Sequence, residues 1–428
     1  MTLIADERYR QFHRTAAQQL TDLYREDDGR PRGLQGVLAW HWALGQEWHH
    51  ALQCALNEAE LLIAMQNSHD ARYWCEQALE YLARLPEAQR HRDAMRAYTL
   101  SWTVLDFAGQ HDDALTFARN MQEMATIEHT STAEGGAWLA LGRSQRALFQ
   151  LEEAEKSLRK ALNIGRSSNN VLLEAEALLH LGKTQQIQGR HIEAIHSYNA
   201  AHERGAIIDD RLTIAKIITS IGDVYRILGA GKEATRHYER ALELEEHLPG
   251  TLGIAIVQEK LALSYLELGE HEKALLCQIE SLMLREKLND TVGLARSYTV
   301  LGIIHNARGD HATAIDAFNQ ALNYESSLQN TVGQTMLHNR MGDTHRALGE
   351  YSEAANHYTM SLDLAQKMND QVGIALTHER LGDLAHDWND IDGAGQHWHS
   401  AFLIRQQLKH YDELKRLREH LRGIGVKV

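Results

Sequence analysis

The chain has 428 residues, with 44 Lys and Arg against 58 Asp and Glu and a formal net charge of −14. This acidic balance disfavours direct binding to nucleic acid, because phosphate partners normally require a basic face. Only three prolines occur and β-branched runs are scarce, so nearly the whole chain can be helical, with little or no sheet.

Membrane and secretory signals are absent from the sequence. No window approaches ~18 uncharged apolar residues, and residues 1–10 lack the layout of a signal peptide. Cys54, Cys75 and Cys277 are isolated and odd in number, which favours free thiols in a reducing compartment. We therefore expect a cytoplasmic protein with no membrane partner.

Residues 1–60 predict an irregular N-terminal helical cap. Apolar residues recur at helical spacing in 7–23, and a helix pair is expected over 34–44 and 48–64, around a turn at Gly45 and Gln46.

Residues 61–140 predict divergent repeat-like helix pairs. Gly109 and Ala114 stand at the turn and packing positions of the regular repeat described below, whereas Trp102 replaces its small residue, so packing here must differ. Six of the eight tryptophans lie in the cap and these divergent pairs: Trp40, Trp42, Trp48, Trp74, Trp102 and Trp138. They indicate the larger core of a capping region, and an aromatic docking surface for another domain is the alternative.

Residues 141–410 predict seven regular units, because one pattern recurs there with a constant 40-residue period. An apolar residue precedes a small one at Gly142, Gly182, Gly222, Ala262, Gly302, Gly342 and Gly382. A turn position follows at Phe149, Gly189, Gly229, Gly269, Gly309, Gly349 and Asn389. Alanine then holds at Ala154, Ala194, Ala234, Ala274, Ala314, Ala354 and Ala394, and a second small residue comes seven positions later, as at Ala161 and Ser281.

This pattern predicts a helix pair in each unit. Small residues seven apart lie on one stripe of a helix and let a second helix come close. The turn glycine suits a left-handed residue at a helix end. One such pair cannot cover its apolar face, so successive pairs stack into a solenoid.

The linkers between units are near copies of one another. Asp290, Asn330 and Asp370 precede a helix and can cap its free amides, and a glycine three residues later suggests close approach to the preceding helix. Residues 249–253 repeat this linker in looser form. After the last unit, residues 411–428 predict a C-terminal capping helix with one charged face.

The repeat columns resemble the tetratricopeptide repeat (TPR), whose standard length is about 34 residues. The 40-residue period places the chain with longer variants of that repeat, and the mid-helix proline of HEAT repeats is absent. The resemblance implies an all-α, right-handed superhelical solenoid of antiparallel helix pairs.

Two groups of sensors use such long repeats: the C-terminal arms of STAND-type signal-transduction ATPases, including bacterial transcription activators, and the peptide-sensing regulators of Gram-positive bacteria. Residues 7–85, with Tyr9, Arg10, Phe12 and His13, are similar to the stretch joining a STAND ATPase core to its arm. This implies a ligand sensor in signalling, transcription regulation or defence, with an N-terminal ATPase as partner. A free-standing scaffold or peptide receptor is the alternative.

Catalytic, cofactor and metal sites are not expected. Gly229, Gly231 and Lys232 resemble a phosphate loop, but Arg226 and Glu233 stand where that motif needs Gly and Ser or Thr. His49, His50 and Cys54, or His397 and His399, could supply metal ligands, yet no established ligand spacing occurs. A caspase-like peptidase would need Cys and His on a mixed sheet, whereas Cys277 falls within a repeat helix.

The TPR resemblance implies that the first helix of each unit lines a concave groove for a protein or peptide. Groove positions lie one and four residues after the small residue and three before it. The polar candidates are Arg143, Arg146, Lys183, Gln186, Asp223, Arg226, Glu259, Asn306, Asn339, Asp343, Arg346, Glu379, Asp383 and His386. Their charge changes from basic, through the apolar Leu263, Leu266 and Ile303, to acidic, which would orient an extended ligand. A merely solvated face is the alternative.

Overall fold

The structure is a computed structural model that describes residues 2–24, 33–65, 67–209, 211–245 and 252–426. Every regular element in these ranges is an α-helix, which confirms the all-α prediction. The chain divides into two compact units, residues 1–220 and 221–428, and α11 (Arg211–Ile227) runs through the division. None of the described helices is both long and apolar enough to cross a membrane.

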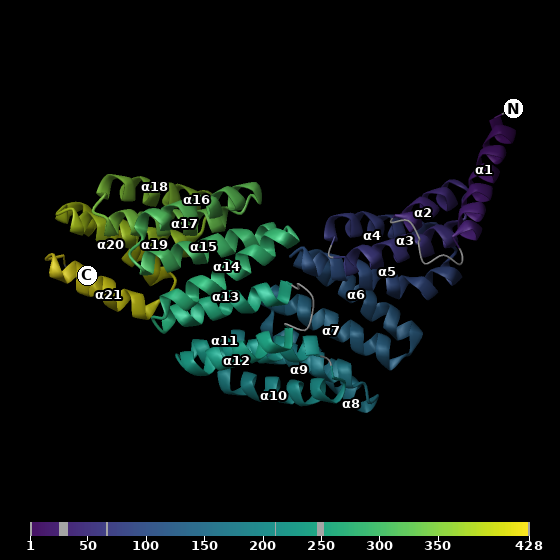
Figure 1. Ribbon diagram of the computed structural model, residues 1–428, viewed down its shortest axis with the longest axis horizontal. Coiled ribbons are helices and arrows are strands. Elements are labelled where there is room, and N and C mark those ends of the chain that lie inside the picture. The colour runs from purple at the N-terminus through teal and green to yellow at the C-terminus, as the bar shows by residue number, and fades with distance from the viewer. Residues whose placement is uncertain (1, 25–32, 66, 210, 246–251, 427–428) are drawn as a thin grey trace. The chain divides into compact units, whose positions relative to one another are not determined.

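The first unit contains α1 to α10 and the start of α11 (Figure 1). Their bounds are α1 Thr2–Leu23, α2 Leu34–Leu44, α3 Trp48–Ala64, α4 Ser68–Arg84, α5 Glu87–Phe107, α6 His111–Glu128, α7 Ser131–Ala147, α8 Leu151–Ser167, α9 Val171–Ile187 and α10 His191–Ile207.

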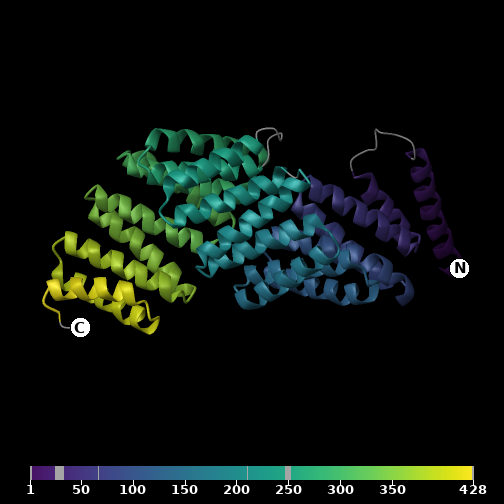
Figure 2. The same cartoon turned by 90° about the horizontal axis from the view of Figure 1, so that it is seen from below.

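The second unit contains the end of α11 and ten further helices. Their bounds are α12 Gly231–Glu245, α13 Leu252–Glu267, α14 His271–Leu288, α15 Thr291–Ala307, α16 His311–Ser327, α17 Thr331–Ala347, α18 Tyr351–Lys367, α19 Gln371–Asp387, α20 Ile391–Gln407 and α21 Tyr411–Gly423. Antiparallel pairs follow one another side by side along each unit (Figures 1 and 2).

Turn residues end the first helix of each pair as the sequence predicts. Gly189, Gly269 and Gly309 have φ of 76°, 75° and 84°, in the left-handed region. At the two ends of the repeat array, Phe149 and Asn389 also adopt positive φ, at 57° and 63°. The backbone therefore keeps one turn geometry even where glycine is replaced.

The small-residue column makes room for a large side chain of the second helix. A Cβ added at Gly342 would lie 2.5 Å from the Tyr358 ring, and one at Gly182 would lie 2.6 Å from the Tyr198 ring. Tyr198 and Tyr358 are fully buried. A ring fills the space beside Gly182, Gly222, Gly302, Gly342 and Gly382, whereas Leu158 fills it beside Gly142, so at these glycines even a Cβ would clash.

The linker caps form at the three predicted positions. Asp290, Asn330 and Asp370 each accept a hydrogen bond from the backbone amide of the glycine three residues later, at 2.9, 3.2 and 3.0 Å. Of the looser linker, residues 249–251 lie outside the described residues.

The N-terminal helices pack around a core of their own. The predicted pair over 34–44 and 48–64 is confirmed by α2 and α3, with Gln46 at positive φ in the turn. Trp42 is buried in this core. Trp102 is buried in the next cluster, and its indole donates a hydrogen bond to Ser144 at 3.0 Å. Trp40 is 53% exposed, so it is not part of that packing.

The last helix, α21, packs its apolar face against the final pair. Leu414, Leu417 and Leu421 are buried against Trp398 and Phe402 of α20. Asp412, Lys415, Glu419 and Arg422 of α21 are exposed, whereas Arg416 pairs with Glu379 of α19.

Candidate functional site

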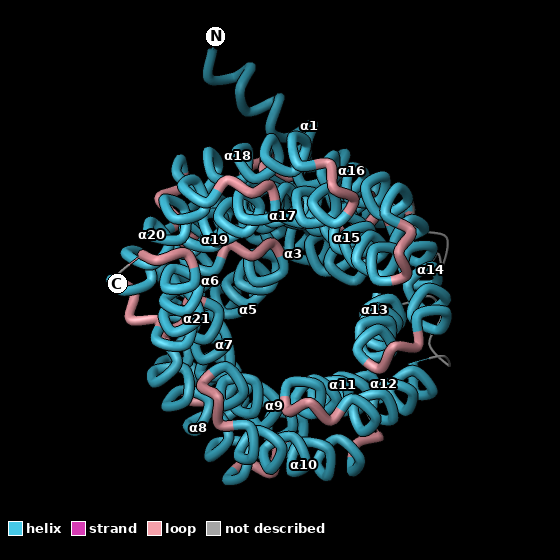
Figure 3. Tube along the Cα trace, turned by 90° about the vertical axis from the view of Figure 1, so that its left-hand side faces the viewer, coloured by secondary structure: helices cyan, strands magenta, loops and turns pink. Residues whose placement is uncertain are grey.

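Within each unit the first helices of the pairs form one layer and the second helices form another. Consecutive first helices touch directly, α7 with α9, α13 with α15 and α17 with α19. They lie on the concave side of each unit (Figure 3). We call the solvent-facing surface of these helices the first-helix layer, and it carries most of the predicted ligand residues.

In the second unit, carboxylates of the first-helix layer pair with cations at a sequence separation of 37. Asp223 lies 2.6 Å from the ammonium of Lys260, and Asp343 lies 3.0 Å from the guanidinium of Arg380. Asp383 lies 3.9 Å from the His420 imidazole. The separation is three positions short of the repeat length, so each pair joins one first helix to the next element of the same layer.

The same carboxylates also accept a hydrogen bond from the second helix of their own pair. Tyr238 donates to Asp223 and Tyr358 donates to Asp343, both at 2.7 Å, while the Trp398 indole donates to Asp383 at 2.9 Å. Burial, and then the Asp343 charge, raise the pKa of Tyr358 above its ordinary range. These carboxylates therefore have fixed positions.

Arginines four positions after the small residue pair with carboxylates at a sequence separation of 41. Arg226 lies 2.7 Å from Glu267, and Arg346 lies 2.6 Å from Asp387. Burial by itself lowers the pKa of Arg226, but the hydrogen bond and the charge of Glu267, together with Tyr238, outweigh burial and raise that pKa. We call these arginine pairs, together with the aspartate pairs above, the ion-pair ladder.

The residues three positions before the small residue were predicted to face the groove, but the structure buries them. Glu259, Asn339 and Glu379 are buried, at 6, 5 and 3% exposure. Glu259 pairs with Arg285 at 2.9 Å and Arg296 at 3.0 Å, and Glu379 pairs with Arg405 at 2.8 Å and also with Arg416. Neighbouring helices cover this column, so these three side chains hold helices together and do not face a groove.

Three other predicted residues have varied surroundings. Asn306 lies 2.6 Å from the His311 ring, which fixes its amide. Gln186 accepts a hydrogen bond from the Tyr198 hydroxyl at 2.8 Å. The His386 side chain is 52% exposed, and its ring centroid lies 5.5 Å from that of Trp398.

In the first unit, the predicted basic residues gather on α7 and α9. Arg143 pairs with Asp106 at 2.5 Å and lies over the Trp102 ring, 4.6 Å from its centroid. Arg146 is half-buried, and its Nε is buried with no hydrogen-bond partner among the described residues. Burial, and next the Arg143 charge, lower the pKa of Arg146.

His180 lies in the same group, although the sequence did not single it out. It is 9% exposed, and its Nδ1 is buried without a hydrogen-bond partner in the described chain. Burial lowers the pKa of His180 well below its usual value, and the charges of Lys183, Arg143, Arg146 and Lys216 add to this effect. The sequence signal for His180 is its position, which is that of Lys260 and Arg380 in the later repeats.

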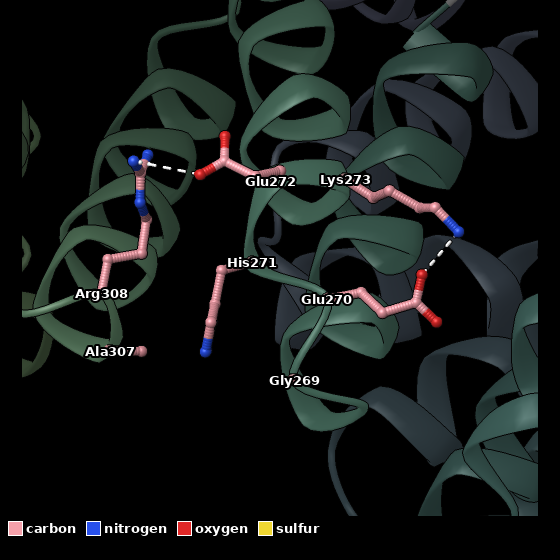
Figure 4. A pocket seen from close by; sticks show the side chains of 7 residues that line it. All are labelled: Gly269, Glu270, His271, Glu272, Lys273, Ala307 and Arg308. Carbon is pink, nitrogen blue, oxygen red and sulfur yellow. Dashed lines mark ion pairs between the residues drawn. The ribbon is translucent and has the colours of Figure 1, made fainter.

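Other candidate sites are less well formed. A hollow beside the turn between α13 and α14 and the end of α15 is lined by charged residues, but Glu272 pairs with Arg308 at 3.1 Å and Lys273 pairs with Glu270 at 2.5 Å (Figure 4). Gly229 lies in the turn before α12 and Gly231 is the first residue of that helix, with no strand before the turn in the described chain. Across the described residues, no group of three or more His, Cys, Asp or Glu is arranged to hold a metal ion.

The three cysteines are free and at least partly buried. Burial raises the pKa of Cys54 to about 11, that of Cys75 to about 12 and that of Cys277 to about 11. These groups stay as thiols at neutral pH, and the neutral thiol is a poor nucleophile.

Comparisons with known proteins agree with this architecture. Family models described as tetratricopeptide repeat match residues 135–166, 213–287, 253–324 and 337–372. Among curated proteins, none matches the sequence.

Solved structures share the fold at low sequence identity. The apo form of the quorum sensor NprR from B. thuringiensis is 15% identical, with a TM-score of 0.58 over 82% of this chain and 97% of that one. The apo form of RapI is 13% identical, with a TM-score of 0.57 over 84% and 99%. A Rap protein complexed with competence and sporulation factor is 18% identical, with a TM-score of 0.52 over 78% and 97%.

These matches, together with the 40-residue helix pairs that continue beyond the matched residues, have one explanation. The chain is a tetratricopeptide repeat protein, an α-solenoid of antiparallel helix pairs.

Proposed function

We propose that the chain is a receptor for a protein or an extended peptide, which it binds along the first-helix layer. One observation carries this proposal: the polar side chains of that layer are held in place by the ion-pair ladder before any ligand arrives. Asp343, for example, is fixed by both Tyr358 and Arg380. A preorganised polar surface loses little conformational freedom on binding, which favours affinity.

Variation along the layer supports the same proposal. The packing columns keep small residues in all seven units, whereas the layer changes from Arg143 and Arg146, through Leu263 and Ile303, to Asp343 and Asp383. A surface of changing charge on a constant scaffold suits recognition of a ligand in one direction. The folds of the quorum sensor NprR and of the Rap protein in complex with its factor are consistent with a receptor.

The test is selection from a displayed library of random peptides on the purified full chain, followed by anisotropy titration of the selected sequences. We expect binding to fall in a variant with Arg143→Glu, Arg146→Glu and Lys183→Glu. The matched control reverses three exposed charges on the second helix α8, with Lys156→Glu, Arg159→Glu and Arg166→Glu, and should bind normally. Unaltered binding by the first variant would remove these residues from the site, and a library that yields no ligand would contradict the receptor itself.

A narrower role is that of sensor arm of a STAND-like ATPase. It rests on the resemblance over residues 7–85 and on the aromatic group at the start of the chain. Tyr9 and Phe12 on α1 are 51 and 64% exposed and, with Trp40, surround His13 at ring distances of 4.5 to 5.5 Å. Exposed aromatic groups of this kind suit docking of another domain. An ATPase encoded in frame upstream of Met1 would support this role, and an in-frame stop codon there would refute it.

A further inference from the structure

The ion-pair ladder lies in the second unit, and its arginine column extends into the first unit at Arg146 without the matching carboxylate. Arg146, Arg226 and Arg346 occupy the same column, and the last two pair with Glu267 and Asp387. The residue 41 positions after Arg146, where Glu267 and Asp387 stand for the other two arginines, is Ile187. Its side chain is 44% exposed and offers no hydrogen-bond acceptor. Among the described residues no carboxylate lies within ion-pair distance of the Arg146 guanidinium, and its buried Nε has no hydrogen-bond partner.

The aspartate pairs of the ladder are also altered at this place. In the second unit Asp223 and Asp343 face a cation. In the first unit Arg143 stands at the repeat position of those aspartates, and His180 stands at the position of their cations. The positive charges of Arg143 and Arg146 add to the lowering of the His180 pKa. Asp106 pairs with Arg143 at 2.5 Å. A position that joins opposite charges in the second unit therefore holds an arginine beside a buried histidine whose pKa is lowered well below its usual value.

We infer that Arg146, with Arg143 and His180 beside it, forms a subsite for a side-chain carboxylate of an acidic polypeptide segment. The ligand would supply the acceptor that Glu267 and Asp387 supply elsewhere. This inference rests on the proposed receptor function and names the chemistry of one part of the ligand.

Several features of the group fit a carboxylate. A guanidinium fork matches the two oxygens of a carboxylate and can bind both at once. Arg146 is half-buried, so the interaction is screened less by salt than one at a fully exposed surface. The unpartnered His180 Nδ1 provides a further polar atom.

A polypeptide fits better than a nucleic acid because the basic group is local. The chain as a whole has a formal net charge of −14. A regular polyanion would be repelled beyond the basic group, whereas an acidic segment of a protein can present carboxylates at this place alone.

The experiment uses the full chain and two fluorescent peptides of the same length, one alternating Glu with Ser and the other with each Glu replaced by Gln. Arg146→Gln removes the fork. Ile187→Glu supplies the missing acceptor, as Glu267 does for Arg226, and so should occupy Arg146 internally while keeping the fold. Lys156→Gln removes one exposed charge from the second helix of the same pair and serves as control.

We expect the acidic peptide to bind the wild type, and Arg146→Gln and Ile187→Glu each to weaken that binding by about tenfold or more, because a hydrogen-bonded charge pair is lost. Lys156→Gln should bind as the wild type does. The Gln peptide should bind the wild type at least about tenfold more weakly than the acidic one. Thermal unfolding of each variant, followed by circular dichroism, checks that the fold is kept.

Three results would overturn the inference: equal binding of the two peptides, unchanged binding by both Arg146→Gln and Ile187→Glu, or displacement of the acidic peptide by inorganic phosphate or oligo-dT at equal concentration. If library selection still yields peptides that depend on the first-helix layer, the receptor function stands without this subsite. If selection yields nothing, the receptor function falls with it.

Discussion

The ion pair between Glu259 and Arg285 leads to a quantitative prediction about stability. Arg285 has a fully buried side chain, and its guanidinium lies 2.9 Å from the Glu259 carboxylate and donates to the Gly293 carbonyl. Two of its nitrogens, Nε and Nη2, have no hydrogen-bond partner among the described residues. Burial lowers the pKa of Arg285, and Glu259 opposes that shift. The carboxylate is therefore the main compensation for a buried charge.

Glu259→Gln removes that compensation and leaves a buried cation, which costs about 3–5 kcal/mol in comparable sites. Replacing both partners by apolar groups, as in Glu259→Leu with Arg285→Met, removes both desolvation penalties and should restore most of the loss. Arg296→Gln is the control. Arg296 also pairs with Glu259, but its side chain is 56% exposed, so its loss should cost less than about 1 kcal/mol.

The assay is urea unfolding followed by circular dichroism, together with amide hydrogen exchange in α13, α14 and α15. Hydrogen exchange is needed because repeat arrays can unfold in parts, and the loss should be concentrated in these helices. The reasoning would be refuted if Glu259→Gln cost less than about 1 kcal/mol, or if the double variant were less stable than Glu259→Gln.

Three further predictions concern the second unit. First, His338 contacts His357 at 3.1 Å, and His378 contacts His397 at 3.0 Å. Burial lowers the pKa of His357 to about 4; the charges of His338 and His345 add to this effect, and the charge of Glu353 opposes it. The folded state then binds fewer protons than the unfolded one, so stability should fall as pH drops from about 6.5 toward 4. The urea midpoint, measured between pH 7.5 and 5.0, should depend less on pH in His357→Asn. Second, Gly342→Ala should destabilise by about 1–3 kcal/mol because its Cβ would meet the buried Tyr358 ring at 2.5 Å, whereas Gly136→Ala on α7, with nothing within 4 Å, should be neutral or stabilising. Equal thermal midpoints for these two variants would contradict the packing argument. Third, Asp370→Ala should cost about 1 kcal/mol because Asp370 caps two amides of α19. Faster exchange confined to the first turn of α19 would verify the cap.

The helix limits were largely predictable because local chemistry sets them. Gly309, followed by a polar residue, predicts a turn, and its φ of 84° requires the conformation that glycine tolerates best. The caps at Asp290 and Asp370 follow from the same kind of local rule. These features depend only on residues within a few positions of one another.

The partners of the first-helix residues were harder to predict. Comparison at the repeat length aligns Asp343 with Asp383, but the cation that neutralises Asp343 is Arg380, at a sequence separation of 37. This offset depends on how far one first helix is displaced along the next, which no single repeat specifies. A search for opposite charges at that separation would have found Asp223 with Lys260 as well. The burial of Glu259 was not predicted either, because it depends on how the neighbouring helices that carry Arg285 and Arg296 are placed against α13.

The ion-pair ladder also limits how freely the repeats can be exchanged. Deleting residues 331–370 would keep every packing column in register, since one whole period is lost in a chain of 40-residue repeats. The deletion removes Asp343 and Arg346, so Arg380 and Asp387 lose their partners. The residue 37 positions before Arg380 would then be Ile303, which carries no charge. Such a shortened chain should fold, yet carry unmatched charges at the new junction. The repeats are thus interchangeable as packing modules but not as electrostatic ones, and their order along the chain is part of what the sequence encodes.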